Sequence, residues 1–242
     1  MTNEIVLIVF YVVILLYSVI LHEVFHGLAA LWLGDVTAKY AGRLSANPFR
    51  HIDPTMTIIM PIMMLVLTGG RFAFGGAKPV PYNPYNLRDQ KWGPSLVAAA
   101  GPGSNIILAF AAAIIAKLLP LTLFVKKDII DSFKIAVGSN LDFFERWHSL
   151  ALSMSGSIAS VFFGILLFII FWNVLLAFFN LIPIPPLDGS KLLFAVLKVK
   201  METMAILEQF GFFILLFFII FFSGPLGYFL NMMLDVFLAI AI

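Results

Sequence analysis

Long apolar stretches alternate with short mixed segments along this chain, and this pattern predicts an all-α integral membrane protein. Three stretches, Ile5–Leu33, Gly93–Leu119 and Ser157–Ile182, each exceed the about 20 residues with which a helix crosses the hydrocarbon core of a bilayer. Two more apolar stretches, Met204–Phe222 and Tyr228–Ile242, lie near the C-terminus. We therefore expect a multi-span helical bundle with about five to six hydrophobic segments.

The segments between these stretches are richer in Gly, Pro and charged residues. Gly34–Asp53 and Thr68–Trp92 predict a membrane-associated region of short strands or loops after the first span. Between them, Thr55–Leu67 is apolar and contains a proline. It is too short for an ordinary span. Pro120–Ser155 holds four basic and four acidic residues and predicts an aqueous loop with a short interfacial helix.

Composition supports the membrane assignment and excludes other classes of protein. Hydrophobic residues make up 62% of the 242 residues and charged residues only 12%, with a mean hydropathy of +1.03. A soluble domain needs more charge to cover its surface. The net charge of +2 and the absence of a Lys/Arg run exclude a nucleic-acid partner. Cysteine is absent, so any metal must be held by His and carboxylate side chains.

The distribution of Lys and Arg, which favour the cytoplasmic side, predicts the orientation. No basic residue precedes Lys39, so we expect the N-terminus outside and the first span running inward. If Thr55–Leu67 enters the membrane and returns, ten basic residues lie inside and four lie outside, in Pro120–Ser155. If Thr55–Leu67 crosses, four of the seven basic residues in Gly34–Trp92 move outside, and both later spans reverse. Charge therefore favours the re-entrant path.

The strongest chemical signal is the sequence His22-Glu23-Val24-Phe25-His26 inside the first apolar stretch. Residues at i and i+4 share a helical face, so both imidazoles can bind one cation, and Glu23 is placed to take a proton from a water that the metal activates. The alternative is a chance group of polar residues in a core helix. Ionisable groups within a span cost at least a few kcal/mol each unless paired, metal-bound or solvated, which favours the metal site. Zinc, one per chain, suits this set.

Catalytic zinc usually takes three protein ligands, so a third is expected elsewhere in the chain. Asp188 is the best candidate, because the prolines in Asn180–Gly189 must end the preceding helix, and irregular backbone at membrane depth lines protein or a cavity. Asp188 can also be an interfacial helix cap. The re-entrant topology favours the ligand, since it places His26 and Asp188 on the same side of the membrane. His51 is a fallback ligand, and His148 is expected to be merely solvated.

These motifs together resemble the site-2 protease family of intramembrane metalloproteases. The family pattern is matched by the HExxH sequence at His22–His26 and by Asn-x-x-Pro-x-Pro-x-Leu-Asp-Gly at Asn180–Gly189. Gly101–Asn105 resembles the motif of the span between them, and Phe74–Arg88 is similar to a loop of the compact bacterial members. The resemblance covers most of Leu21–Gly189.

The resemblance implies zinc ligands at His22, His26 and Asp188, a catalytic base at Glu23, a site open to the cytoplasm, and transmembrane proteins as substrates. It also implies a compact member without PDZ or CBS domains. We expect residues 1–242 to be one intramembrane protease domain, with the catalytic core at 5–200. A C-terminal hydrophobic hairpin at 203–242 is expected to turn at Ser223–Gly227.

Two asparagines are secondary candidates. Asn180 can donate its amide to a substrate carbonyl, which is a large effect in other hydrolases, or it can bond another helix. We count Asn180 with the catalytic residues. Asn105 is expected to support helix packing, because Gly101 and Gly103 suggest a close helix approach.

The predicted function is hydrolysis of peptide bonds in the transmembrane segments of substrates within the cell membrane. Phe74–Arg88 can pair with an unwound substrate as an added strand. The alternative function is a membrane metal transporter or metal sensor that uses the same ligands. A transporter needs a polar path through the spans, and it has no necessary role for Glu23.

Overall fold

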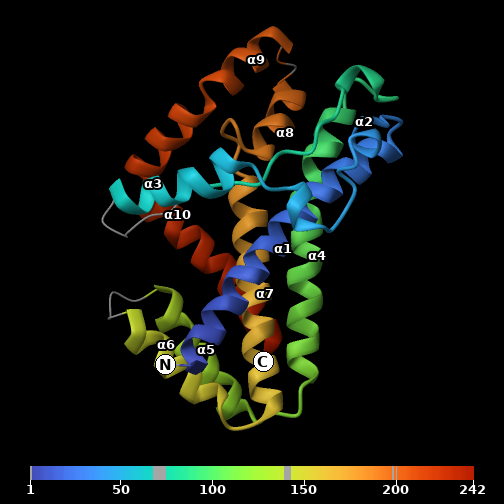
Figure 1. The fold of residues 1–242 in the computed structure, drawn as a ribbon. Helices are drawn as coiled ribbons and strands as arrows, with labels where there is room; N and C mark the ends of the chain where they lie inside the picture. Colours follow the sequence, from blue (N-terminus) through green and yellow to red (C-terminus); the bar gives the residue numbers. More distant parts are fainter. Residues whose placement is uncertain (1, 68–74, 139–142, 198, 200) are drawn as a thin grey trace. The chain divides into compact units, whose positions relative to one another are not determined.

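A computed structural model describes residues 2–67, 75–138, 143–197, 199 and 201–242 of the chain (Figure 1). Four helices are long and apolar enough to cross a membrane: α1 (Thr2–Trp32), α4 (Gly93–Leu118), α7 (Ile158–Asn180) and α10 (Gly211–Ala241). The chain is therefore a multi-span, all-α membrane protein, as the apolar stretches predict. The described residues hold four such spans, because the last two apolar stretches both lie in α10, whose two helical segments meet at a kink at Phe222.

Shorter helices occupy the connections between these spans. They are α2 (Thr37–Tyr40), α3 (Met60–Leu67), α5 (Leu123–Gly138), α6 (Phe143–Met154), α8 (Asp188–Leu197) and α9 (Met201–Gln209), with 3-10 turns at Pro48–Arg50 and Pro84–Asn86 and a π-helical turn at Pro54–Ile59. The predicted unwinding between the third span and Asp188 is confirmed, since α7 ends at Asn180 and α8 begins at Asp188.

No strand occurs among the described residues after the first span, so of the predicted strands or loops only loops, joined by short helical segments, are found there. Residues 77–83 form neither a helix nor a strand. Pro79 and Pro81 have no N–H to donate to a neighbouring strand. The N–H of Lys78 donates to the His51 carbonyl at 2.8 Å, and that of Val80 to a side chain. Part of this loop, residues 68–74, lies outside the described residues.

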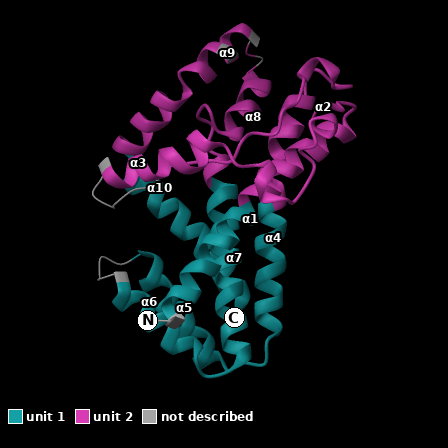
Figure 2. Cartoon of the chain, in the orientation of Figure 1, with its two compact units in different colours: residues 1–18, 105–178, 222–242 teal, residues 19–104, 179–221 magenta. Residues whose placement is uncertain are grey.

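The chain divides into two compact units, coloured separately in Figure 2. Unit 1 comprises residues 1–18, 105–178 and 222–242. Its core is formed by apolar side chains from α1, α4, α5, α6, α7 and α10. The aromatic part includes Tyr11, whose carbonyl accepts a hydrogen bond from Nε1 of Trp172 at 3.0 Å.

Pro120–Ser155 is more helical than the predicted loop with one short interfacial helix. This segment forms α5 and α6, which belong to unit 1. The buried residues of α5 include Ile129, Phe133 and Ala136, which recur at helical spacing and give the helix one apolar face. His148 on α6 is also not merely solvated, since its Nδ1 lies 2.6 Å from Oε1 of Glu4.

Three buried polar residues connect α1, α4 and α7 within unit 1. Nδ2 of Asn105 donates to Oδ1 of Asn173 at 2.7 Å, and Nδ2 of Asn173 donates to the Ser18 hydroxyl at 2.9 Å. Their exposed fractions are 4% or less. Asn105 therefore holds helices together, as expected for a packing role.

Unit 2 comprises residues 19–104 and 179–221. It contains the second half of α1, the loops after it, the start of α4, and α8. The loop between α7 and α8 folds tightly, because a Cβ at Gly189 would lie 2.6 Å from the carbonyl oxygen of Ile182. Glycine at this position lets the chain turn back directly behind Asp188.

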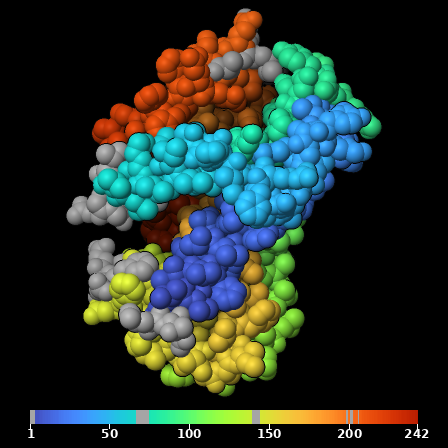
Figure 3. Space-filling model, in the orientation of Figure 1, coloured from blue at the N-terminus to red at the C-terminus, as the bar shows by residue number. Residues whose placement is uncertain are grey.

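The apolar segment Pro54–Val66 is helical and short, about 20 Å at 1.5 Å per residue, which is less than the about 30 Å hydrocarbon core. Several of its apolar side chains are exposed, including Ile59 and Ile62, and the segment lies on the surface in Figure 3. These features suit a lipid-facing segment. The re-entrant path stays a prediction.

The predicted turn at Ser223–Gly227 lies directly after a kink in α10, and the C-terminal hairpin stays a prediction. These residues are helical within α10, and the helix is interrupted one residue earlier, at Phe222, where φ is −119° and ψ is 17°. Pro225 follows this break. Proline is tolerated in the first turn of a helix, where its missing N–H has no partner to lose, so a helix can restart there.

Candidate metal centre

His22 and His26 lie one turn apart on α1, with ring centroids 4.6 Å apart. Together with Glu23 they form a group whose ligand atoms all lie within 4.8 Å of one another. His22 is buried, and the other two are partly buried. The i, i+4 spacing therefore brings the two imidazoles to one place, as the sequence predicts.

Asp188, the first residue of α8, meets both histidines. Its Oδ2 atom lies 3.1 Å from Nε2 of His22 and 3.1 Å from Nε2 of His26. In a tetrahedral zinc site with bonds near 2.0 Å, ligand atoms are separated by about 3.3 Å. Two imidazole nitrogens and one carboxylate oxygen at this spacing fit zinc in both chemistry and size.

Charge around Asp188 favours its ionised form. Burial raises the pKa of the carboxyl group, but hydrogen bonds with His22 and His26 and the positive charge of Lys191 hold the pKa below its usual range. Nζ of Lys191 lies 3.9 Å from Oδ1 of Asp188. Burial lowers the pKa of Lys191, but the neighbouring Tyr82 and Asp188 outweigh it and raise that pKa. One carboxylate oxygen thus faces the histidines and the other faces a cation.

Two residues of α4 position the histidines, one through a hydrogen bond and one through close packing. Nδ1 of His26 donates to the Val97 carbonyl at 2.7 Å, so Nε2 is the nitrogen left to face Asp188 and a metal. Gly101 lies directly against the histidines: a Cβ there would collide with His26 and lie 2.7 Å from Nε2 of His22. The expectation of a close approach is confirmed at Gly101, whereas a Cβ at Gly103 would meet nothing within 4 Å.

Glu23 accepts a hydrogen bond from the backbone N–H of Val80, at 2.8 Å from its Oε2 atom. Val80 belongs to the loop between α3 and α4, which the sequence suggested as a partner for substrate. The inward N–H of Val80 is therefore already engaged by Glu23. Any pairing with substrate through that N–H would have to compete with the carboxylate.

The remaining candidates lie in different settings. Asn180 is the last residue of α7 and is partly buried. His51 is 1% exposed, and its Nε2 donates to the Ser45 carbonyl at 2.7 Å. The fallback assignment of His51 as third ligand is therefore wrong in this structure, because Asp188 holds the position beside the histidines.

Sequence reasoning missed Lys191, Tyr82 and Val80. Lys191 follows Asp188 by three residues, so helical spacing alone could have indicated it. Its Nζ lies 5.9 Å from the centre of the Tyr82 ring. Val80 contributes a backbone group, which leaves no signal in the side-chain pattern.

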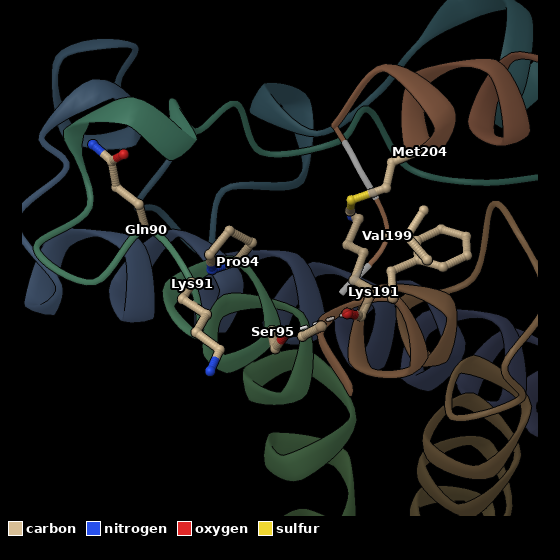
Figure 4. Close-up of a pocket in the computed structure, with 9 residues that line it drawn as sticks. Gln90, Lys91, Pro94, Ser95, Lys191, Val199 and Met204 are labelled. Carbon is tan, nitrogen blue, oxygen red and sulfur yellow. Dashed lines mark hydrogen bonds between the residues drawn. The ribbon is translucent and has the colours of Figure 1, made fainter. Parts of the chain in front are cut away.

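A pocket of about 360 Å³ lies beside Lys191 in unit 2 (Figure 4). The Ser95 hydroxyl donates to the Lys191 carbonyl at 3.1 Å on one wall of the pocket. The lining combines the two lysines and a glutamine with apolar side chains: Gln90, Lys91, Pro94, Ser95, Lys191, Phe194, Ala195, Val199 and Met204. A side chain that carries both apolar and anionic groups suits this lining.

Comparisons with known proteins agree with this centre. The family model described as Peptidase family M50 matches residues 10–222. The chain is 32% identical over 217 residues to "Putative zinc metalloprotease YwhC" of Bacillus subtilis (strain 168), which covers 89% of this chain and 81% of the relative. It is 27% identical over 174 residues to "Putative zinc metalloprotease Rip2" of Mycolicibacterium smegmatis, covering 72% of this chain and 52% of that relative. No solved structure matches the chain.

Proposed function

The chain belongs to peptidase family M50, and we propose that it is a site-2-type endopeptidase that cuts transmembrane segments of other membrane proteins. It is an intramembrane zinc metalloprotease by family and by the chemistry of its centre. The meeting of His22, His26 and Asp188, with Glu23 on the same helical turn, is the observation that supports the proposal most.

We propose that His22, His26 and Asp188 hold the zinc. When bound, zinc lowers the pKa of water toward neutrality and polarises a carbonyl. Glu23 removes the proton from the attacking water and later delivers it to the leaving amine. Its carboxylate is held by the Val80 N–H through one oxygen, Oε2, which leaves Oε1 to move the proton.

Asn180 has a proposed role in holding the substrate carbonyl. It ends α7 eight residues before Asp188, where the backbone leaves the helix. An amide donor that meets developing negative charge is worth about 2.7–4 kcal/mol in other hydrolases. Asn180→Ala is expected to lower kcat while leaving the zinc content unchanged.

The orientation of the site is a further part of the proposal. The basic residues favour a cytoplasmic opening and an N-terminus outside. A helical substrate must unwind before its carbonyls can be attacked, so spans that contain Gly, Pro or Asn are the expected substrates.

The test is Glu23→Gln, which keeps the size of the side chain but removes its basicity. Wild-type protein and the variant would be reconstituted with a library of single-span membrane peptides containing Gly, Pro or Asn, and the products identified by mass spectrometry. We expect wild-type cleavage and none by the variant, with about one zinc per chain in both, since Glu23 is not a ligand. Equal cleavage by both would refute the role of Glu23. Metal flux into vesicles without cleavage would support the transporter function instead.

A further inference from the structure

The carboxylate of Glu23 is held by a backbone group, the N–H of Val80. Its Oε2 accepts the Val80 N–H at 2.8 Å, across 57 residues of sequence. A hydrogen bond to an ionised carboxylate is among the stronger kinds, and it fixes the orientation of the acceptor. The orientation of the proposed base therefore depends on where the stretch around Val80 lies.

Arg43 fixes that stretch. Its guanidinium is buried, with the residue 7% exposed, and it binds backbone carbonyls. One nitrogen donates to the Arg50 carbonyl, and the other donates to the carbonyls of Lys78 and Pro79, the latter at 3.3 Å. The two residues before Val80 are thus held by one side chain.

Besides these contacts, two prolines and a further hydrogen bond limit the backbone conformation around Val80. Pro79 and Pro81 fix their own φ angles on either side of Val80 and restrict the residues before them. The Lys78 N–H also donates to the His51 carbonyl at 2.8 Å. A displacement of Lys78 and Pro79 therefore carries Val80 with it.

Gly27 leaves the space that lets Val80 approach α1. Gly27 follows Glu23 by four residues, so both lie on one face of the helix. A Cβ at Gly27 would lie 2.8 Å from Cγ1 of Val80 and 2.6 Å from Cδ2 of Leu44. The buried Val80 side chain packs here, and its backbone comes within reach of Glu23.

We propose that Arg43 is a positioning residue for Glu23, acting through the backbone of Lys78, Pro79 and Val80. This inference rests on the proposed function. The hydrogen bonds of the Arg43 guanidinium go to backbone carbonyls of the loops, and their effect is to hold the N–H that orients the base. A merely structural anchor would stabilise the loop without changing the chemical step.

The kinetic test compares Arg43→Met and Arg43→Lys with the matched control Arg50→Met. Arg50 lies in the same loop, is exposed, and donates to the Gly42 carbonyl at 2.6 Å, but its side chain does not hold residues 78–80. The substrate is a peptide that the wild-type protein cleaves in the library experiment. Zinc content is measured for each variant.

Arg43→Met is expected to lower kcat by about ten- to a hundredfold, because misplacing a catalytic group by 1 Å can cost a hundredfold. KM and the zinc content should stay within about twofold, since no substrate or metal contact is lost. Arg43→Lys keeps the charge but lacks the planar guanidinium with its several N–H donors. Its kcat should therefore lie between those of the wild type and of Arg43→Met. Arg50→Met should retain the wild-type kcat.

Hydrogen exchange gives a second measurement that does not depend on cleavage. Residues 77–82 carry only four backbone amides, because Pro79 and Pro81 have none. Arg43→Met should accelerate exchange of the Lys78 and Val80 amides. Glu23→Ala should accelerate that of Val80 alone, since the Lys78 amide keeps its bond to His51.

The outcomes separate this inference from the proposed function. An active wild type beside an Arg43→Met variant with unchanged kcat, with raised KM alone, or with lost zinc would overturn the role of Arg43 only. If Arg43→Met does not fold, Arg43→Lys decides by the same criteria. A zinc-loaded wild type that cleaves no member of the library would overturn the proposed function, and this inference with it.

Discussion

Nε2 of His22 lies 3.1 Å from Oδ2 of Asp188, although 166 residues separate them in the chain. The two residues come from the first span and from the helix that follows the third span. A buried carboxylate and an imidazole at this distance are either an ion pair or two ligands of one metal. The second imidazole, at the same distance from the same oxygen, favours a metal site.

Asp188→Ala is expected to lose zinc, and His51→Ala is expected to keep about one zinc per chain. Catalytic zinc needs three protein ligands, and Asp188 is the one beside both histidines. His51 binds the Ser45 carbonyl instead, so its loss should lower stability by about 1–3 kcal/mol. Zinc per chain by mass spectrometry and thermal unfolding check both effects. A folded His51→Ala variant without zinc would contradict the ligand set.

Gly101→Ala should abolish zinc binding. A Cβ at this position collides with His26 and approaches Nε2 of His22, so it fills the space where the two nitrogens face a metal. Gly103→Ala is the matched control, because its Cβ would meet nothing within 4 Å. The measurement is the zinc content of the two purified variants, which should be lost in Gly101→Ala and kept in Gly103→Ala. Equal zinc in the two would show that the histidines can move aside without losing the metal.

Periodicity and span length were enough to predict the helical membrane fold and the meeting of His22 with His26. Both depend on spacing within one helix, which the sequence states directly. Asp188 could be suggested because prolines before it force the helix to end. In each of these cases the information is local.

The errors come from interactions between distant segments. α5 is amphipathic and carries charges of both signs, as a helix on the protein surface would. The sequence therefore could not show that its apolar face, which includes Phe133, is buried in the core. Of the strands or loops expected near Val80 only a loop is found, because the Val80 N–H donates to Glu23 instead of to another strand. Backbone contacts of this kind leave no mark on the residue pattern.

Asn173→Ala should destabilise the protein by about 1–2 kcal/mol without loss of zinc. The substitution removes two buried hydrogen bonds, the 2.7 Å bond from Nδ2 of Asn105 and the 2.9 Å bond to the Ser18 hydroxyl, and each such bond contributes about 1 kcal/mol. The exposed Asn231 on α10 is the matched control, since Asn231→Ala removes an amide from the surface. Thermal unfolding in detergent measures both. Equal melting temperatures would mean that the network does not contribute to stability.

Asp35 should make stability depend on pH. Burial raises the pKa of its carboxyl group, but hydrogen bonds from Thr37, Asn86 and the Asn83 N–H outweigh this and lower the pKa. A lowered folded-state pKa stabilises the protein above the unfolded-state value of about 3.9, and this stabilisation is lost as the pH falls through the folded-state pKa.

The check is the difference in thermal stability between wild type and Asp35→Asn from pH 7 to pH 3. Only an ionised carboxylate can accept all the bonds that Asp35 receives, including 2.7 Å from the Asn83 N–H and 2.9 Å from Nδ2 of Asn86. The difference should therefore be largest near neutral pH and shrink toward pH 3. Loss of zinc in acid affects both proteins and cancels in the comparison. The exposed Asp128, changed to Asn, controls for net charge. A difference that stays constant over this range would mean that the charge of Asp35 does not hold the turn at Asn83.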